Sequence, residues 1–213
     1  MVVTKYVLQP ADLEKAVKIG EGKYREVFRV DDFAIKILKP HVRKNYGLFH
    51  IDFPSYLYTK HKFGIVDFNQ FEYGIFRDFI ERVPVEFREM FAQIHSVGKI
   101  NGKSYSLSDI VVNRDGSLSK TLTQQGELDN YDFWRQIEEL EEVLTDNTIQ
   151  IMDIRGENIM VQEVEGKVVP VFIDFKRYGG RTYPIQFWLL SEKQLIAKMQ
   201  RRFQRLRELY QPS

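Results

Sequence analysis

Residues 153–158 read Asp-Ile-Arg-Gly-Glu-Asn, and residues 171–175 read Val-Phe-Ile-Asp-Phe. The first stretch places an aspartate and an asparagine five residues apart in a predicted loop. The second places Asp174 at the end of an apolar predicted strand, where a carboxylate is costly to bury unless it is solvated or paired with a cation. A metal ion is one such cation. Together with the segments that precede them, these two stretches decide the fold prediction.

The loop of residues 153–158 carries groups that suit phosphoryl transfer. Asp153 can accept a proton from an attacking hydroxyl, and the amide oxygen of Asn158 can bind Mg²⁺. Arg155 can neutralise charge on a transferring phosphoryl group. The hexapeptide alone is more typical of a polar loop with an Asx turn, so its meaning depends on the rest of the chain.

Two further features lie near the N-terminus. Gly20 and Gly22 allow backbone amides to approach phosphate oxygens, although two glycines are also typical of a plain tight turn. Lys36 lies in a predicted strand, on the face opposite Ile35 and Ile37. If that face covers a nucleotide site, the ammonium of Lys36 can reach the α- and β-phosphates. The alternative is that Lys36 is an exposed lysine of the sheet.

The hydrophobic pattern predicts mostly strands in the first half of the chain and mostly helices in the second. Asn101-Gly102 permits a type I′ turn between two long antiparallel strands. The predicted strands are 27–30, 33–38, 90–100, 103–112, 159–161 and 168–173. The predicted helices are 69–80, a helix from Asp129 or Asn130 to 144, and 192–210 after a Ser191 cap.

The composition excludes several classes of function. The 213 residues include 31 Lys and Arg, 30 Asp and Glu, and no cysteine, so the formal net charge is +1. This balance argues against a protein that coats nucleic acid or anionic lipid, and the lack of cysteine excludes disulfides and cysteine nucleophiles. We see no signal peptide and no apolar run near the length of about 20 residues that spans a bilayer. We expect a cytoplasmic protein without a transmembrane segment, and we do not expect nucleic acid as a partner.

The order of four segments resembles the signature set of protein kinases. These segments are Gly20-Glu21-Gly22, Ala34-Ile35-Lys36, Asp153 to Asn158, and Ile173-Asp174-Phe175. In detail the chain is more similar to the small bacterial YrbL family (PhoP regulatory network proteins), which is kinase-like. That similarity includes Gly-x-Gly-x-x-Arg at 20–25, Asn-Arg-Asp-Gly-Ser at 113–117 and the tail 184–203.

The resemblance implies an α+β, small two-lobed protein-kinase-like fold. A β-rich N-terminal lobe would cover residues 1–112, with an aromatic and basic insertion at 41–68 that is either a packed cover or a docking surface. A minimal, mostly helical C-terminal lobe would cover residues 113–213 and carry the catalytic and metal-binding loops.

The resemblance also implies an enzyme that uses ATP and Mg²⁺ to phosphorylate a hydroxyl of a protein, a sugar or a small molecule. Asp153 would be the base, Lys36 and Arg155 the other catalytic residues, and Asn158 and Asp174 the metal ligands. The remaining nucleotide contacts would be Gly20, Gly22, Val27, Ala34, Glu72 as the partner of Lys36, and the hinge residues Ile110, Val112 and Asn113.

Departures from the kinase pattern leave a second class of function open. Arg25 replaces the third glycine of the loop, Ile151 stands where protein kinases usually have His, and Lys176 replaces the glycine of Asp-Phe-Gly. Only 39 residues follow Asp174, too few for a full activation segment and peptide-docking helices. The alternative is a nucleotide-binding pseudokinase that acts as a regulatory or scaffold module.

Overall fold

The computed structural model describes residues 8–22, 25–39, 68–149, 153–174 and 191–212, which form two compact units. The first unit comprises the described residues up to Phe76 together with residues 93–110, and the second comprises residues 77–92 and those from Val111 onward. The units are therefore interleaved along the chain, and the continuous lobes 1–112 and 113–213 stay a prediction. The proposed insertion at 41–68 lies almost entirely outside the described residues.

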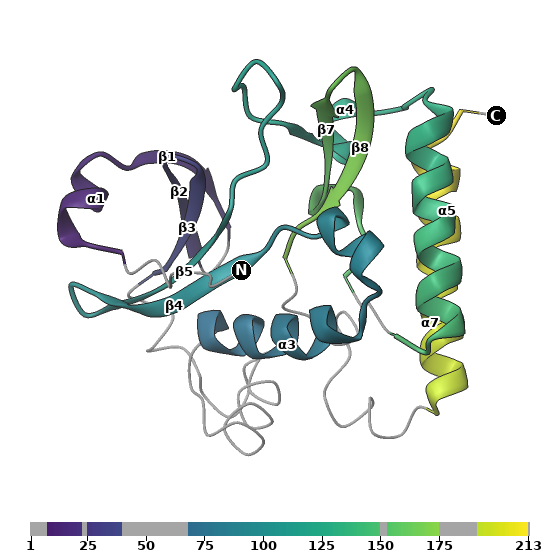
Figure 1. The fold of residues 1–213 in the computed structure, drawn as a ribbon, viewed down its shortest axis with the longest axis horizontal. Helices are drawn as coiled ribbons and strands as arrows, with labels where there is room; N and C mark the ends of the chain where they lie inside the picture. The colour runs from purple at the N-terminus through teal and green to yellow at the C-terminus, as the bar shows by residue number, and fades with distance from the viewer. Residues whose placement is uncertain (1–7, 23–24, 40–67, 150–152, 175–190, 213) are drawn as a thin grey trace. The chain divides into compact units, whose positions relative to one another are not determined.

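A five-stranded antiparallel sheet with the order β1-β2-β3-β5-β4 forms most of the first unit (Figure 1). The predicted type I′ turn at Asn101-Gly102 is confirmed, because both residues adopt positive φ, 48° and 72°. The elements are α1 (Pro10–Glu14), β1 (Val17–Glu21), β2 (Arg25–Val30), β3 (Phe33–Leu38), β4 (Ile94–Ile100) and β5 (Lys103–Asp109).

Strand β4 begins later than predicted. Residues Val85–Met90 form the 3-10 helix η2 after Pro84, and Phe91 then forms a parallel bridge with Phe172 in the second unit. The apolar residues around Phe91 suggested that β4 begins at residue 90. Phe91 is instead apolar because it pairs with Phe172.

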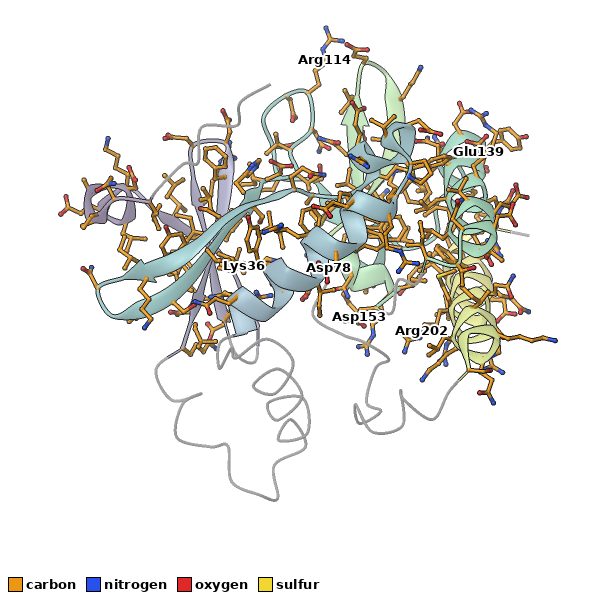
Figure 2. All side chains as sticks on the ribbon, turned by 60° about the horizontal axis from the view of Figure 1, so that its bottom comes forward. Lys36, Asp78, Arg114, Glu139, Asp153 and Arg202 are labelled. Atoms are coloured by element: carbon orange, nitrogen blue, oxygen red, sulfur yellow. The ribbon has the colours of Figure 1, made fainter. Side chains whose placement is uncertain are left out.

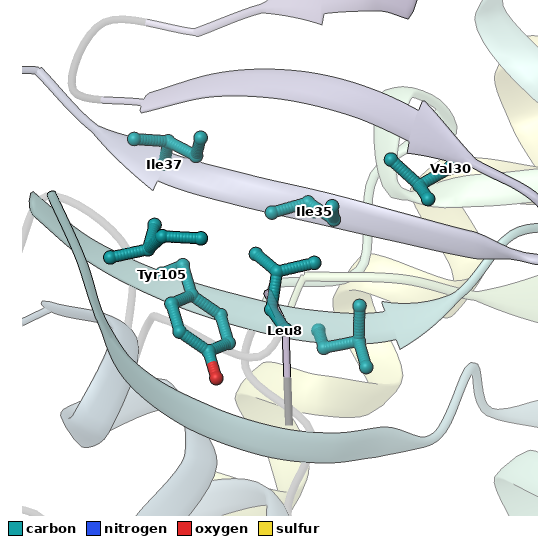
Figure 3. Close-up of a cluster of buried hydrophobic side chains, with 7 residues drawn as sticks. Leu8, Val30, Ile35, Ile37 and Tyr105 are labelled. Carbon is teal, nitrogen blue, oxygen red and sulfur yellow. The ribbon is translucent and has the colours of Figure 1, made fainter. Parts of the chain in front are cut away.

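The sheet of the first unit has one apolar and one polar face, because side chains alternate along each strand. On the apolar face, Ile35, Ile37 and Tyr105 pack with Leu8 and Val30 (Figure 3). Cross-strand pairing places another set of side chains on the opposite face: Val27, Ala34, Lys36, Ser104, Ser106 and Ser108. The face of Lys36 thus follows the sequence prediction.

Helix α3 spans Phe68–Arg82, whereas the sequence predicted a helix over residues 69–80. The observed helix is thus one residue longer at its start and two residues longer at its end. It begins in the first unit and ends in the second. In the second unit, Phe79 packs edge-on against the ring of Phe91, with ring centroids 4.9 Å apart.

A three-stranded antiparallel sheet with the order β6-β7-β8 belongs to the second unit. The turn between β7 and β8 is Glu165-Gly166, and both residues adopt positive φ. The elements are β6 (Lys120–Thr121), α4 (Leu122–Gln125), the 3-10 turn η3 (Gly156–Asn158), β7 (Ile159–Val164) and β8 (Lys167–Phe172).

Helices α5 (Tyr131–Asp146) and α7 (Glu192–Tyr210) lie side by side in the second unit (Figure 1). Arg207 of α7 donates to Glu141 of α5 at 2.7 Å. Their buried stripes are Phe133, Ile137, Leu140 and Leu144 on α5, and Leu195, Met199, Phe203 and Leu206 on α7. No helix in the described part of the chain is long and apolar enough to cross a membrane.

Candidate functional site

The predicted site residues fall into two groups, one in each unit. In the first unit, Lys36 lies on β3 (Figure 2), and its Nζ is 3.1 Å from Oε1 of Glu72 on α3. The Glu72 side chain is fully buried, and that of Lys36 is 13% exposed. The structure thus forms the ion pair that we expected between these two residues.

Arg25 is a second partner of the same carboxylate. Its guanidinium donates to Glu72 Oε2 and, at 3.0 Å, to Oδ1 of Asn69, and the arginine is buried. It can reach α3 because it shares a face of β2 with Val27, the cross-strand neighbour of Lys36. The residue that departs from the kinase glycine pattern therefore shares the glutamate that pairs with Lys36.

Asn69 ties the first turn of α3 to the sheet. Its Nδ2 donates to Ser104 Oγ at 3.0 Å and to the Lys36 carbonyl at 3.4 Å. Because Asn69 precedes Glu72 by three residues, both side chains lie on the same side of the helix. Strands β2, β3 and β5 and helix α3 thus share one buried polar network.

Two cations keep Glu72 ionised. Burial by itself raises the pKa of this carboxyl, but the charges of Arg25 and Lys36 and their hydrogen bonds outweigh burial and hold the pKa well below its usual value. Lys36 has three N–H donors and one side-chain partner among the described residues. Two donors of Lys36 therefore remain for an anion such as a phosphate.

The two glycines lie where β1 leads into β2. Gly20 is opposite Val27 in the strand pairing, and the Gly22 N–H donates to the Arg25 carbonyl at 2.8 Å. A Cβ added at either glycine would meet its nearest neighbours at 3.7–4.0 Å, which is ordinary contact. Packing within the described residues thus does not require glycine here, and the open backbone suits the approach of a ligand.

The segment of residues 110–113 uses some of its backbone groups internally. Asn113 places its N–H and its side chain in a turn with Ser117, and the Val112 carbonyl accepts from Gln162 at 2.7 Å. The Ile110 carbonyl and the Val112 N–H make no hydrogen bond within the described part of the chain. These two groups, like the Val111 N–H, are available to a ligand.

In the second unit, the loop of Asp153 (Figure 2) meets the segment of Asp174 at one end of the β7–β8 hairpin. Asn158 Nδ2 donates to the Asp153 carbonyl at 3.1 Å, and the Ile173 N–H donates to the Asn158 carbonyl at 2.8 Å. Asp174 comes next, with a φ of 66° that aspartate tolerates better than most residues. The structure thus brings together the residues predicted as base and metal ligands.

Arg155 lies beside the predicted base. Its Nε is 3.0 Å from Asp153 Oδ1, a distance typical of an ion pair, although the two groups are not aligned for a hydrogen bond. The Asp153 side chain is 9% exposed and that of Arg155 is 43% exposed. A half-exposed cation therefore accompanies a nearly buried carboxylate.

The oxygen donors of this group fit a magnesium ion that also binds phosphate. Asn158 Nδ2 donates to a carbonyl, so Oδ1 is the atom left over, and no described residue donates to it. Amide and carboxylate oxygens suit Mg²⁺, which commonly takes only one or two carboxylates from a protein. Among the described residues, no three His, Asp or Glu side chains cluster as a metal site. A metal held by Asn158 and Asp174 would therefore need further ligands from a nucleotide.

Sequence reasoning missed the roles of Arg25 and Asn69. It named Arg25 as a replaced glycine and as part of the Gly-x-Gly-x-x-Arg resemblance but gave it no partner, and it gave Asn69 no role. The available signal was the spacing of Asn69 and Glu72, which places both on one side of the helix. The partnership of Arg25 with Glu72 spans 47 positions, and no local pattern in the sequence indicates it.

The fold resembles solved protein-kinase domains. The PknI kinase domain of Mycobacterium tuberculosis matches with a TM-score of 0.50 and 14% identity, over 89% of this chain and 71% of that one. The BubR1 kinase domain matches with a TM-score of 0.46 and 16% identity, over 75% of this chain and 45% of that one. The chain thus spans between 45% and 71% of the length of these domains, and 59% of a double-mutant PknI domain.

No family model matches the sequence, and no curated protein matches it. The likeness to the PknI domain shows the fold, which is a small two-lobed α+β fold of the protein-kinase type.

Proposed function

We propose that this protein is a kinase-like phosphotransferase that moves the γ-phosphoryl group of ATP to a hydroxyl. The observation that carries the proposal is the junction at the end of the β7–β8 hairpin. There Asn158 bonds to the Asp153 backbone through its side chain and to the segment of Asp174 through its carbonyl. One asparagine thus holds a candidate base next to a candidate metal ligand.

Residues of the first unit and the adjoining Val112 of the second support nucleotide binding. Lys36 is anchored by a buried glutamate and retains two N–H donors for phosphate oxygens. The Ile110 carbonyl and Val112 N–H offer an acceptor and a donor of the kind that an adenine edge requires. Gly20, Gly22, Val27 and Ala34 complete the proposed ATP contacts.

In the proposed reaction, Asp153 orients the acceptor hydroxyl and takes its proton. A bond forms between the hydroxyl oxygen and the γ-phosphorus, and the bond from that phosphorus to the β–γ bridging oxygen breaks, which releases ADP. Asn158 and Asp174 would hold Mg²⁺, whose charge stabilises the phosphate oxygens when it is bound. Arg155, beside Asp153, can neutralise charge on the group in transfer.

We further propose that the protein belongs with the YrbL family of kinase-like proteins. The support is the Gly-x-Gly-x-x-Arg segment, whose arginine is bonded to Glu72, and the residues 113–117, which form a hydrogen-bonded turn. The acceptor would be a hydroxyl of a protein, a sugar or a small molecule.

A pseudokinase is the second candidate. The observation that favours it is the position of Arg155, because a cation already contacts the carboxylate that must accept the proton. In that case the protein binds nucleotide as a regulatory or scaffold module and transfers no phosphate.

Substitution of the base separates the two candidates. We expect Asp153→Ala to retain ATP affinity and to slow phosphoryl transfer by about 10²–10⁴-fold, which is the usual contribution of a general base. The measurement is transfer of labelled γ-phosphate to protein or to added hydroxyl compounds, with nucleotide affinity measured by calorimetry.

Asp115→Ala is the matched control, because Asp115 is an exposed aspartate of the same unit. Equal transfer rates in the wild type and Asp153→Ala would remove Asp153 from the mechanism. Nucleotide binding without any transfer in the wild type would identify a pseudokinase.

A further inference from the structure

Gly156 lies inside the Asp153–Asn158 loop, where neighbouring side chains leave no room for a Cβ atom. Its backbone conformation does not itself require glycine. It is buried, and it is not among the glycines with positive φ. A Cβ at this position would lie 2.5 Å from Oγ1 of Thr123 and 2.8 Å from both Cζ and the hydroxyl oxygen of Tyr210. Two side chains from distant parts of the chain therefore press directly on this loop.

These two side chains also bond to each other. The hydroxyl oxygens of Thr123, on α4, and Tyr210, the last residue of α7, are 3.0 Å apart. We call this pair the Tyr210–Thr123 clamp. Its two members are 87 residues apart in the sequence and meet beside the backbone of Gly156.

Both members of the clamp are anchored. The Tyr210 carbonyl accepts from the Leu128 N–H at 2.8 Å, and the Leu128 carbonyl accepts from the indole of Trp134 at 2.8 Å. Thr123 belongs to α4, whose N-terminus is fixed by a capping box between Thr121 and Gln124. These bonds fix the backbone positions from which the two side chains reach Gly156.

The loop needs such support. Its only regular element is the single 3-10 turn η3, in which the Asn158 N–H donates to the Arg155 carbonyl, and 3-10 hydrogen bonds have poorer geometry than α-helical ones. The side chain of Asn158 closes the loop onto the Asp153 carbonyl. Gly156 lies between these residues, so a shift of Gly156 moves both candidate functional side chains.

We propose that Tyr210 is a positioning residue: through the clamp it holds Gly156 and thereby sets the geometry of Asp153 and Asn158. This inference rests on the proposed phosphotransfer function, since Tyr210 itself touches no reacting group. The end of α7 is thus a support of the candidate catalytic loop as well as the end of a packed helix.

The test compares Tyr210→Ala, Tyr210→Phe and Tyr131→Ala in the full chain. Tyr131 is the matched control, because it is a tyrosine at the start of the neighbouring helix α5 and is 80% exposed. Amide hydrogen exchange of residues 154–158 reports on the loop, and steady-state kinetics report on kcat and on the KM for ATP.

We expect faster exchange of the loop in Tyr210→Ala and a kcat about ten- to a hundredfold lower, with KM for ATP unchanged, because small misplacements of reacting groups have effects of this size. Tyr210→Phe keeps the ring against Gly156 and should retain most of the activity. Tyr131→Ala should behave as the wild type. Loop exchange or kcat in Tyr210→Ala equal to that of Tyr131→Ala would overturn the proposal.

A reciprocal variant keeps the test independent of a folding failure at Tyr210. Gly156→Ala forces the clamp apart, and we expect it to increase loop exchange as Tyr210→Ala does. Added to Thr123→Ala/Tyr210→Ala, the same substitution should have little further effect, because the clashing atoms are gone and the effects are no longer additive. Full additivity would overturn the proposal.

The exchange measurement also separates failure of the clamp from failure of the proposed function. A wild type that transfers no phosphate overturns the phosphotransfer role and with it the positioning role, whatever the loop does. Active wild type with unchanged loop exchange in Tyr210→Ala overturns the clamp alone.

Discussion

At the scale of single residues, Arg25 shows how a departure from a family pattern can be part of a site. The arginine replaces a small residue of the glycine-rich segment and places a second cation on Glu72. A carboxylate buried as fully as this one is costly unless it is paired. Arg25 and Lys36 therefore depend on the same glutamate, and Glu72 depends on both.

We expect Arg25→Ala to lower the free energy of unfolding by about 3–5 kcal/mol, the usual cost of removing one partner of a buried ion pair. Arg29→Ala, on the same strand but in a more exposed position, should cost less than about 1 kcal/mol. Urea denaturation of both variants measures the difference. Similar losses for the two arginines would show that the pair with Glu72 contributes no special stability.

His95 is a second residue whose chemistry depends on one neighbour. Its Nε2 lies 2.5 Å from Asp109 Oδ1, and this hydrogen bond raises the pKa of the imidazole above its usual value, against the opposing effect of partial burial. The charged pair therefore stabilises the fold fully below the unfolded pKa of about 6.5, and this stabilisation is lost as the pH rises through the higher folded pKa.

We expect Asp109→Asn to lower the pKa of His95 toward 6.5, measured by NMR titration of the ring protons. The stability difference between the wild type and the variant should also be larger at pH 5 than at pH 8. Asp115→Asn, which replaces an exposed aspartate of the other unit, should leave the His95 titration unchanged. A His95 pKa unaffected by Asp109→Asn would show that this carboxylate is not the cause.

At the scale of elements, capping decided a boundary that the sequence left open. Both Asp129 and Asn130 are good N-caps for α5, and the pattern did not choose between them. In the structure, the Asn130 side chain accepts from the Phe133 N–H at 2.9 Å. Ser191, the only cap that we predicted for α7, accepts from the Gln194 N–H.

We expect Asn130→Ala to cost about 1 kcal/mol of stability, the typical value for loss of an N-cap. Asp129→Ala should cost distinctly less, because within the described residues the N-cap bond of α5 comes from Asn130. Thermal unfolding of the two variants side by side is the measurement. A larger loss of stability in Asp129→Ala than in Asn130→Ala would show that Asn130 is not the N-cap that stabilises α5.

At the scale of the whole molecule, the fold is of the protein-kinase type, and each unit holds one group of predicted site residues. A nucleotide that binds only the folded state stabilises it, by about 2.7 kcal/mol at a hundredfold excess over Kd. The melting temperature of the whole chain therefore reports on nucleotide binding.

We expect Mg·ATP to raise the melting temperature of the wild type. In Asp174→Ala the effect of Mg·ATP should fall toward that of ATP with EDTA, since the variant lacks a candidate metal ligand. Asp115→Ala is again the control. A shift of the same size in Asp174→Ala and the wild type would argue against Asp174 as a metal ligand.

Several elements were predictable because their signals are local. The bounds of β3 and α7 follow from strand alternation and from a helical stripe with a capping serine, and the Asn101-Gly102 turn follows from the backbone freedom of those two residues. The pairing of Lys36 with Glu72 was predicted from the kinase resemblance. Strand β4 was predicted too long, because Phe91 is apolar for a contact outside that strand.

The sequence by itself determined the order of the elements and supplied the residues on which the phosphotransfer proposal depends, because helix, strand and turn preferences act over a few neighbouring residues. Only the tertiary structure decided that Arg25 shares Glu72 with Lys36, that the Asn158 carbonyl accepts from the segment of Asp174, and that Tyr210 lies against Gly156. Those contacts join residues whose separation in the chain leaves no local pattern, and they form only when burial of the apolar faces brings their elements together.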